Sequence, residues 1–354
     1  MDDRGGVVVP ASAPLATRAE RDAAVQRLDA ASSMDELFDA VDSLRMLPGW
    51  HPNRPPVPRQ PTLNFKPYHW DWDVAKAALE AAGRLVDTKQ AERRNLVLLN
   101  PAGRYPTTPT LVAAYQTLLP GEVARSHRHT PNAGRLMLDV GEGVWTIVDG
   151  VQIDLEVGDV VLTPGWCWHG HGNDGSKYST WLDFVDTPLV YFLDTFFFEP
   201  YPGEYQDATE RTRTGPYVFP WKETKKQLEN AATDEVFGTR VQLGDPAFPS
   251  MALYMERIRA GERIAPYRTT ASRQYCVVEG KGRSKIEGLS VEWSRGDVFV
   301  APCWSWQEHV AEEDSVLFVM TDEPLQRYLR FFRTEVGADA AQRRGEIPAA
   351  TVIT

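Results

Sequence analysis

The feature that most constrains the fold of this sequence is an internal repeat. One copy begins at Gly121 and ends at His171, and the other begins at Gly261 and ends at His309. Each copy holds, in the same order, the punctuating residues Gly141, Gly143, Gly158, Asp159, Pro164, Trp166 and Trp168, or Gly280, Gly282, Gly296, Asp297, Pro302, Trp304 and Trp306. A repeat this long predicts that one structural module occurs twice.

The text of each repeat predicts β-structure. Short β-branched segments separated by Gly, Pro, Asn or Asp run from Leu96 to Val185 and again from Met251 to Thr321, which is typical of a sandwich or barrel. Apolar spacing of three to four residues predicts helices elsewhere: two within 19–47, one over 73–91 and one over 324–336. We therefore predict an all-β fold of two modules with N-terminal and C-terminal helical additions.

These patterns give the following boundaries: an N-terminal helical arm and Pro-rich linker at 1–95, a first β-module at 96–202, a connecting segment at 203–245, a second β-module at 246–323, and a C-terminal helix and tail at 324–354. Residues 48–67 include seven prolines, which exclude regular helix and central strand. That stretch is expected to be extended along the surface or to reach a neighbouring subunit.

Charge and cysteine usage narrow the function classes. The formal net charge of -11 disfavours binding to nucleic acid or to an anionic membrane, because the long-range field repels both. The three cysteines show no CxxC spacing, which suits a reducing cytoplasm. No signal-peptide pattern and no apolar run long enough for a membrane span occur, so export is not expected.

Two His-x-His pairs point to a metal site in the first module. His127 and His129 form one pair, and His169 and His171 form the other, from a total of seven histidines. On a strand this spacing puts both side chains on one face, about 7 Å apart along the backbone. Surface or packed histidines are the structural alternative for either pair alone. Imidazoles by themselves also suit Zn, Cu, Ni or Mn.

The motifs around these histidines resemble a known family. Gly121 precedes His127 and His129 by the spacing of one cupin motif, and a second cupin motif places Gly158, Pro164, His169 and Asn173 at matching intervals. More narrowly, 120–130 and 164–173 resemble the gentisate and salicylate 1,2-dioxygenases, over about 93–336 of the chain. The resemblance implies two jelly-roll (double-stranded β-helix) cupins, Fe(II) on His127, His129 and His169, and a homo-oligomer, often a tetramer.

One departure from the broad cupin pattern fits the narrower family. Residues 130–134 contain no carboxylate, whereas many cupins place a glutamate there as a fourth ligand. Three neutral imidazoles leave the charge of a divalent ion to be balanced by an anionic bidentate substrate. A 2-hydroxybenzoate offers such a pair in its carboxylate and its phenolate, and a position remains for O2.

The second module is expected to lack this chemistry. Alignment of the glycines places Tyr267 and Thr269 where the first module has His127 and His129, and Gln307 at the place of His169. Such a module cannot build the same site, so we expect it to be structural and to pack against the first module or another subunit.

Several residues are candidates for contact with the substrate. Arg135 either grips its carboxylate, as the matching arginine does in the family, or makes a structural ion pair. His171 shares a face with His169, and the resemblance makes it a substrate-contacting acid/base group, although by spacing alone a metal ligand or a packed histidine also fits.

Three further candidates rest on weaker signals. Asp183 would orient His171 or meet a ring substituent, with a solvated strand-end carboxylate as the alternative. Gln116 would hydrogen-bond the substrate or bound oxygen, or serve only the fold. Arg94 would add a second carboxylate contact on a loose family match.

The predicted activity is insertion of O2 between the carboxyl-bearing C1 and the hydroxyl-bearing C2 of an aromatic acid. Gentisate, salicylate, 1-hydroxy-2-naphthoate and 5-substituted salicylates such as 5-nitrosalicylate present the same chelating pair. Two alternatives stay open: a non-catalytic cupin that binds a small molecule, and a metal-dependent isomerase or decarboxylase on the same scaffold.

Overall fold

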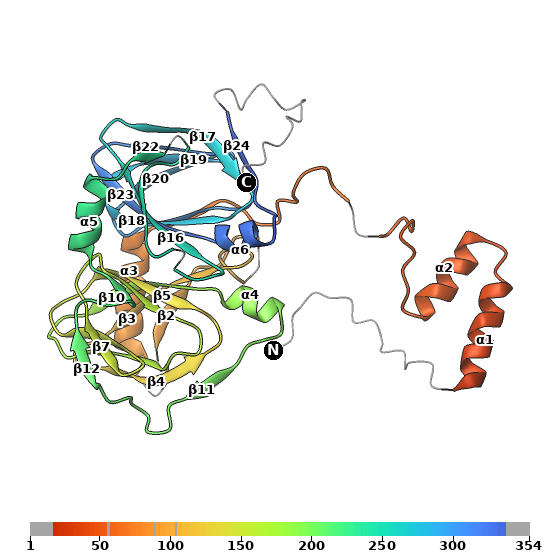
Figure 1. Cartoon of the computed structure of the whole chain (residues 1–354), viewed down its shortest axis with the longest axis horizontal. Helices are drawn as coiled ribbons and strands as arrows, with labels where there is room; N and C mark the ends of the chain where they lie inside the picture. The colour runs from red at the N-terminus through yellow and green to blue at the C-terminus, as the bar shows by residue number, and fades with distance from the viewer. Residues whose placement is uncertain are drawn as a thin grey trace. The chain divides into compact units, whose positions relative to one another are not determined.

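The computed structural model describes residues 17–54, 57–87, 90–91, 93–102, 105–234, 236–245 and 247–337, and it divides into two units at Gln60. The first unit holds two helices, α1 (Arg18–Asp29) and α2 (Met34–Ser43) (Figure 1). Each begins at a hydroxyl N-cap that accepts a backbone N–H, so the prediction of two short helices is confirmed.

The first β-module of the second unit consists of two facing sheets. One has the strand order β13-β8-β5-β10-β3-β2 and the other β11-β4-β9-β6-β7-β12. The strands are β2 (Arg94–Val97), β3 (Val112–Leu118), β4 (Val123–His129), β5 (Ala133–Asp139), β6 (Val144–Val148), β7 (Val151–Asp154), β8 (Val160–Thr163), β9 (His169–Asn173), β10 (Ser179–Val185), β11 (Phe198–Pro200), β12 (Glu210–Thr212) and β13 (Val218–Phe219).

The second β-module repeats this architecture, as Figure 1 shows in teal and blue. Its sheets have the orders β1-β21-β18-β23-β16-β15-β14 and β20-β19-β22-β17-β24. The strands are β1 (Tyr68–Trp70), β14 (Thr233–Asp234), β15 (Gly238–Gln242), β16 (Ala252–Ile258), β17 (Arg263–Thr269), β18 (Arg273–Glu279), β19 (Lys281–Ile286), β20 (Leu289–Ser294), β21 (Val298–Ala301), β22 (Gln307–Ala311), β23 (Ser315–Thr321) and β24 (Thr334–Val336). The predicted duplication and all-β class are confirmed.

Two helices explain the repeated Gly-Asp pair. The first residue of α3 (Trp72–Leu85), Trp72, donates its backbone N–H to Asp297 of the second module at 2.7 Å. The first residue of α5 (Trp221–Glu229), Trp221, donates to Asp159 of the first module at 2.8 Å. Each indole lies over the glycine before that aspartate, where a Cβ would come within 2.6 Å. Helix α3 thus precedes the first module in the chain but caps the second, and α5 precedes the second module but caps the first.

The β13-β8-β5-β10-β3-β2 sheet of the first module packs against the seven-stranded sheet of the second module. Alternate residues of β3 and β10, such as Tyr115 and Phe184, share one buried cluster with residues of β16 and β23, such as Met255 and Phe318. The opposite faces of these strands line the two barrel interiors. The second module therefore packs against the first, as expected, and this shared core fixes the sheet that carries Arg135.

Several predicted boundaries are wrong. The linker predicted at 1–95 contributes β1 to the second module and β2 to the first, and the segment 203–245 contains strands of both. The predicted helix 73–91 ends at Leu85, because residue 86 turns to extended backbone. At the C-terminus α6 spans only Glu323–Tyr328, and β24 then pairs with β17. Residues 1–16 and 338–354 lie outside the described residues.

The remaining helix of this unit, α4 (Thr187–Phe192), follows β10 as α6 follows β23. No helix in the described part of the chain is long and apolar enough to cross a membrane.

Candidate metal centre and active site

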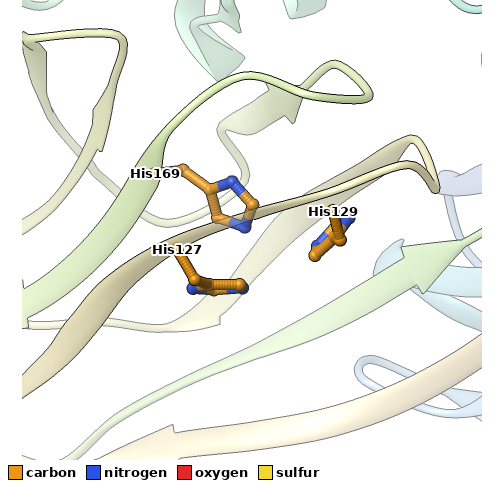
Figure 2. Close-up of side chains that lie close together, drawn as sticks. All are labelled: His127, His129 and His169. Carbon is orange, nitrogen blue, oxygen red and sulfur yellow. The ribbon is translucent and has the colours of Figure 1, made fainter. Parts of the chain in front are cut away.

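Three histidines converge inside the first module (Figure 2). His127 and His129 lie on β4, and His169 begins β9, its antiparallel neighbour. His127 is the register partner of His169, so the two strands bring both imidazoles to the same level of the barrel. The potential ligand nitrogens of the three lie within 4.8 Å of one another. The structure therefore brings together the three predicted metal ligands.

Hydrogen bonds orient two of these rings for metal binding. The Nδ1 atom of His129 lies 2.8 Å from the carbonyl oxygen of Pro131, and that of His169 lies 3.0 Å from the carbonyl of Cys167. Because a carbonyl only accepts, Nδ1 carries the proton and Nε2 keeps its lone pair. The Nε2 atom of His169 is buried without a hydrogen-bond partner among the described residues. A divalent cation fits this donor set.

Burial keeps the three rings neutral. It is the largest cause that lowers the pKa of His127 to about 2 and of His129 to about 4, and it holds the pKa of His169 well below its usual value. The Arg93 guanidinium lowers the pKa of His127 further. At neutral pH all three are therefore in the form that binds a metal, so binding requires no loss of protons from them.

Arg135 lies on β5 in the barrel wall and is 5% exposed. Its Nε lies 3.1 Å from Oδ1 of Asp183, and its Nη1 donates to Oγ1 of Thr163 at 3.1 Å. Asp183 also accepts from the indole N–H of Trp181 at 3.0 Å. Burial lowers the pKa of Arg135 to about 10, which still leaves a cation at neutral pH. The predicted structural ion pair is thus present. The charge of Arg135 also lowers the pKa of His127, His129 and His169, so the arginine lies near all three.

His171 is oriented by a hydroxyl and not by Asp183, which corrects the expectation for that carboxylate. Its Nδ1 lies 2.6 Å from Oγ1 of Thr146, the residue paired with it across β6 and β9. Its Nε2 is buried and has no partner within the described chain. The ring centroid lies 5.9 Å from that of His169, so an unsatisfied nitrogen remains beside the metal ligands.

Gln116 lies on β3 opposite Trp181 of β10. Its side chain is buried, and its Nε2 finds no hydrogen-bond partner among the residues described. An unpaired buried amide costs about 1 to 3 kcal/mol unless a ligand or water satisfies it. Gln116 lies two register positions from the Ala114–Asp183 pair and so on the same face of the sheet, where a small molecule in the barrel can reach it.

The expectation for Arg94 is wrong. Arg94 of β2 is the register partner of Thr117 of β3, so it faces away from the side of the sheet that carries Gln116. Its guanidinium donates to both carboxylate oxygens of Glu122, at 2.6 and 2.8 Å, and to the carbonyl of residue 86. The preceding residue, Arg93, instead places Nη2 at 2.7 Å from Nδ1 of His127. Sequence reasoning missed Arg93, Thr146 and Thr163.

Comparison with known proteins now bears on this geometry. Residues 114–185 match the cupin domain family. The chain is 33% identical to gentisate 1,2 dioxygenase 1 of Aquipseudomonas alcaligenes, over 84% of this chain and 95% of that one. It is 31% identical to 5-aminosalicylate 1,2-dioxygenase of a Comamonas species, over 87% and 91%. The chain belongs to the gentisate and salicylate 1,2-dioxygenase family.

A solved structure agrees with this assignment. Salicylate 1,2-dioxygenase from Pseudaminobacter salicylatoxidans superposes with a TM-score of 0.79 at 29% identity, covering 86% of this chain and 97% of that one. The predicted two-cupin fold and family resemblance are therefore confirmed over the 86% of this chain that the match covers.

The second cupin of this dioxygenase-family chain has no equivalent metal ligands. Tyr267 and Gln307 are register partners at the level that His127 and His169 occupy in the first cupin. The Tyr275 hydroxyl joins them, at 2.9 Å from the Tyr267 hydroxyl and 2.5 Å from Oε1 of Gln307. Over the described ranges, the only cluster suited to a metal is the three-histidine one. Side-chain hydrogen bonds thus fill the second barrel, as expected.

Both cupins have a similar arginine clamp, an arginine held between two tryptophans and paired with a glutamate, on the strand equivalent to β4. Arg128 lies 4.4 Å from the ring centroids of both Trp166 and Trp168, and it pairs with Glu199 of β11 at 2.6 Å. In the second cupin Arg268 makes the same contacts with Trp304, Trp306 and Glu335. Because Arg128 stands between His127 and His129 and the tryptophans precede His169, this clamp ties the two ligand segments together.

We expect Arg128→Met to weaken metal affinity about tenfold, as loss of a residue that orients ligands does. The change removes the cation between the indoles and the ion pair to β11, so the ligand strands lose a shared anchor. Competition with a chelator of known affinity measures the effect. Arg268→Met is the matched control, with a comparable loss of melting temperature and unchanged metal affinity. Equal metal affinity in both variants would assign the clamp to the fold alone.

Proposed function

We propose that this protein is an Fe(II)-dependent ring-cleaving dioxygenase that inserts both atoms of O2 between C1 and C2 of a 2-hydroxybenzoate. The observation that carries the proposal is the set of three neutral imidazoles at His127, His129 and His169, in the same barrel as a buried arginine. Family membership supports the reaction type, since the relatives are named 1,2-dioxygenases.

The metal would be held by the three histidines alone. Bound iron(II) would supply a Lewis acid for the carboxylate and phenolate of the substrate and a source of electrons for O2. Three neutral nitrogen ligands leave its charge uncompensated, which favours an anionic bidentate substrate over a neutral one.

The remaining polar side chains would bind and orient that substrate. Arg135 supplies a buried positive charge toward the carboxylate, and its ion pair with Asp183 fixes the direction of the guanidinium. His171, held by Thr146, presents a nitrogen that exchanges a proton with the 2-hydroxyl or a ring substituent. Gln116 offers an amide hydrogen bond at the same face. Asp183 is then a positioning residue, and its predicted catalytic role acts through Arg135.

Substrate identity rests on the wall of this site. The face of β3 that carries Gln116 has the small side chains Val112 and Ala114 beside it, which leaves room for a ring substituent. Relatives are named for gentisate and for 5-aminosalicylate, and one structure of the Pseudaminobacter enzyme holds gentisate. We propose gentisate or another 5-substituted salicylate, such as 5-nitrosalicylate, as the substrate.

An oxygen electrode tests the proposal. Iron-reconstituted protein is expected to consume O2 with gentisate or a 5-substituted salicylate, and to give no turnover of the same compound without O2. The panel consists of gentisate, salicylate, 5-aminosalicylate, 5-nitrosalicylate and 1-hydroxy-2-naphthoate, with benzoate as the control that lacks the 2-hydroxyl. Turnover without oxygen would favour an isomerase or decarboxylase, and binding without turnover would favour a non-catalytic cupin.

We also propose a homo-oligomer, with a tetramer as the expected state, in the cytoplasm. Support for assembly comes from the apolar side chains after β10, where Phe192 is 83% exposed and Phe197 is 63% exposed. Exposed aromatic side chains of this kind are typical of protein interfaces. Support for the cytoplasm comes from Cys167, Cys276 and Cys303, which are all unpaired.

A further inference from the structure

The second cupin has a cavity of its own, of about 770 Å³. It lies between β15, β16 and α6, and its lining includes Arg240, Gln242, Ser250, Tyr254, Leu325 and Arg327. None of the three metal-site histidines lines it. A volume in this range suits a small organic ligand.

The cavity occupies the place that corresponds to the proposed substrate wall of the first cupin. Gln242 pairs with Tyr254 on β15 and β16 as Val97 pairs with Ala114 on β2 and β3. The neighbouring helices correspond as well, since α4 and α6 each follow the last long strand of a cupin and carry proline in the first turn. In the second cupin, Tyr267, Tyr275 and Gln307 thus fill the position of the metal site, while this outer part of the pocket stays open.

Arg240 is a cation in this lining without a good anionic partner. Its guanidinium carbon lies 4.1 Å from the ring centroid of Phe237 and 4.5 Å from that of Tyr254, so the two rings fix it. Its Nη1 is buried and has no hydrogen-bond partner in the described chain. Among the described residues it forms one ion pair, with Asp234 at 3.6 Å from Nη2, which is too far for a good hydrogen bond.

The other charges of the lining largely neutralise one another. Arg327 donates to Glu323 at 2.7 Å, which leaves Asp245 as the remaining carboxylate and Arg240 as the remaining cation. The apolar part of the wall includes Tyr254, Leu325 and two prolines. A ligand that satisfies Arg240 and covers this wall needs one carboxylate and one flat apolar body.

We propose that this cavity is a second, metal-free site for a monocyclic aromatic carboxylate. The carboxylate binds Arg240, and the ring lies against Tyr254 and Leu325. The choice of an aromatic acid rests in part on the proposed function, because that substrate class is what the duplicated pocket would have been built for. The site itself stands on the cavity and on Arg240.

Benzoate is the probe for this site, because it has the carboxylate and ring but lacks the 2-hydroxyl needed for cleavage. Calorimetric titration of the iron-loaded full chain is expected to give two benzoate molecules per chain. Arg240→Met keeps the stacked bulk but removes the charge, so it is expected to lose one of the two, with at least about a tenfold rise in that Kd. Arg135→Met is expected to lose the other, and the double variant both.

Two further variants keep the result interpretable. Leu325→Trp fills the cavity without touching a charge and is expected to remove the same binding event as Arg240→Met. Arg257→Met is the matched control. Arg257 is the register partner of Thr239, which precedes Arg240 in β15, so Arg257 and Arg240 lie on opposite faces of the same strand pair. The control is expected to keep both events.

The outcomes separate this proposal from the proposed function. If Arg240→Met and Leu325→Trp both leave the benzoate stoichiometry of the parent unchanged, the second site does not exist. If inorganic phosphate binds Arg135→Met at this site as tightly as benzoate does, the site binds anions in general and the aromatic assignment is wrong. If Arg135→Met alone has no effect, the role of Arg135 fails while the cavity site stands.

Discussion

His169→Ala is expected to yield folded protein that holds less than about a tenth of the iron of the parent and cleaves no ring. The change removes one of three nitrogen ligands from a set that has no carboxylate to replace it, and metal affinity depends on ligand number. Metal analysis after anaerobic reconstitution with Fe(II) and desalting measures the result, with the melting temperature as a check on folding.

The duplicated fold supplies the control for this experiment. Gln307 occupies in the second cupin the register position of His169, where it accepts a hydrogen bond from the Tyr275 hydroxyl. Gln307→Ala is therefore expected to lower stability, through the loss of a buried hydrogen bond, and to leave iron content at one per chain. Iron retained by His169→Ala, or lost from folded Gln307→Ala, would contradict the assignment of the metal to the first cupin.

The second large effect is expected at Arg135. Arg135→Lys keeps the charge but replaces a planar fork with a point charge, and loss of one charge-assisted hydrogen bond costs about 1.5 to 3 kcal/mol. We expect kcat/KM to fall roughly ten- to a hundredfold. Arg135→Met is expected to fall further, because Asp183 is left buried without its counter-ion and repels the substrate carboxylate.

The cleavage rate at unchanged iron content separates the two possible roles of Arg135. Iron content is expected to stay at the level of the parent in both variants, because the Arg135 side chain contacts Asp183 and Thr163 rather than a proposed ligand. If both variants fold, keep iron and cleave their substrate at the parental rate, Arg135 serves only its ion pair with Asp183. Arg93, next to His127, would then be the candidate for the carboxylate contact.

The sequence predicted those parts of the site that depend on short-range periodicity. His-x-His on a strand fixes both side chains to one face, and two such strands paired in register can only bring the rings together. The absence of histidine at Tyr267, Thr269 and Gln307 likewise predicted a second cupin without the metal site. The repeated glycines and prolines predicted two β-modules, because turn positions recur with the strands they separate.

Features that depend on register between distant strands could not be predicted. Arg93 and Arg94 are adjacent, and only the pairing of β2 with β3 decides which of them faces the barrel. Thr146 is the partner of His171 through the pairing of β6 with β9, whereas the sequence alone suggested Asp183. The strand β1 pairs with β21 of the second cupin, and Trp72 just after it donates to Asp297, 225 residues away. None of these contacts leaves a local pattern.

Ring cleavage in labelled oxygen tests the central claim most directly. Iron-loaded protein is turned over with gentisate under ¹⁸O₂, and the ring-opened product is analysed by mass spectrometry. The account predicts that one atom of O2 enters the new carboxylate and the other the new keto group, in the parent and in Gln307→Ala, and that His169→Ala gives no product. Because the keto oxygen exchanges with water, the label in the new carboxylate decides. A parent product whose new carboxylate carries no label would contradict a 1,2-dioxygenase at the three-histidine site.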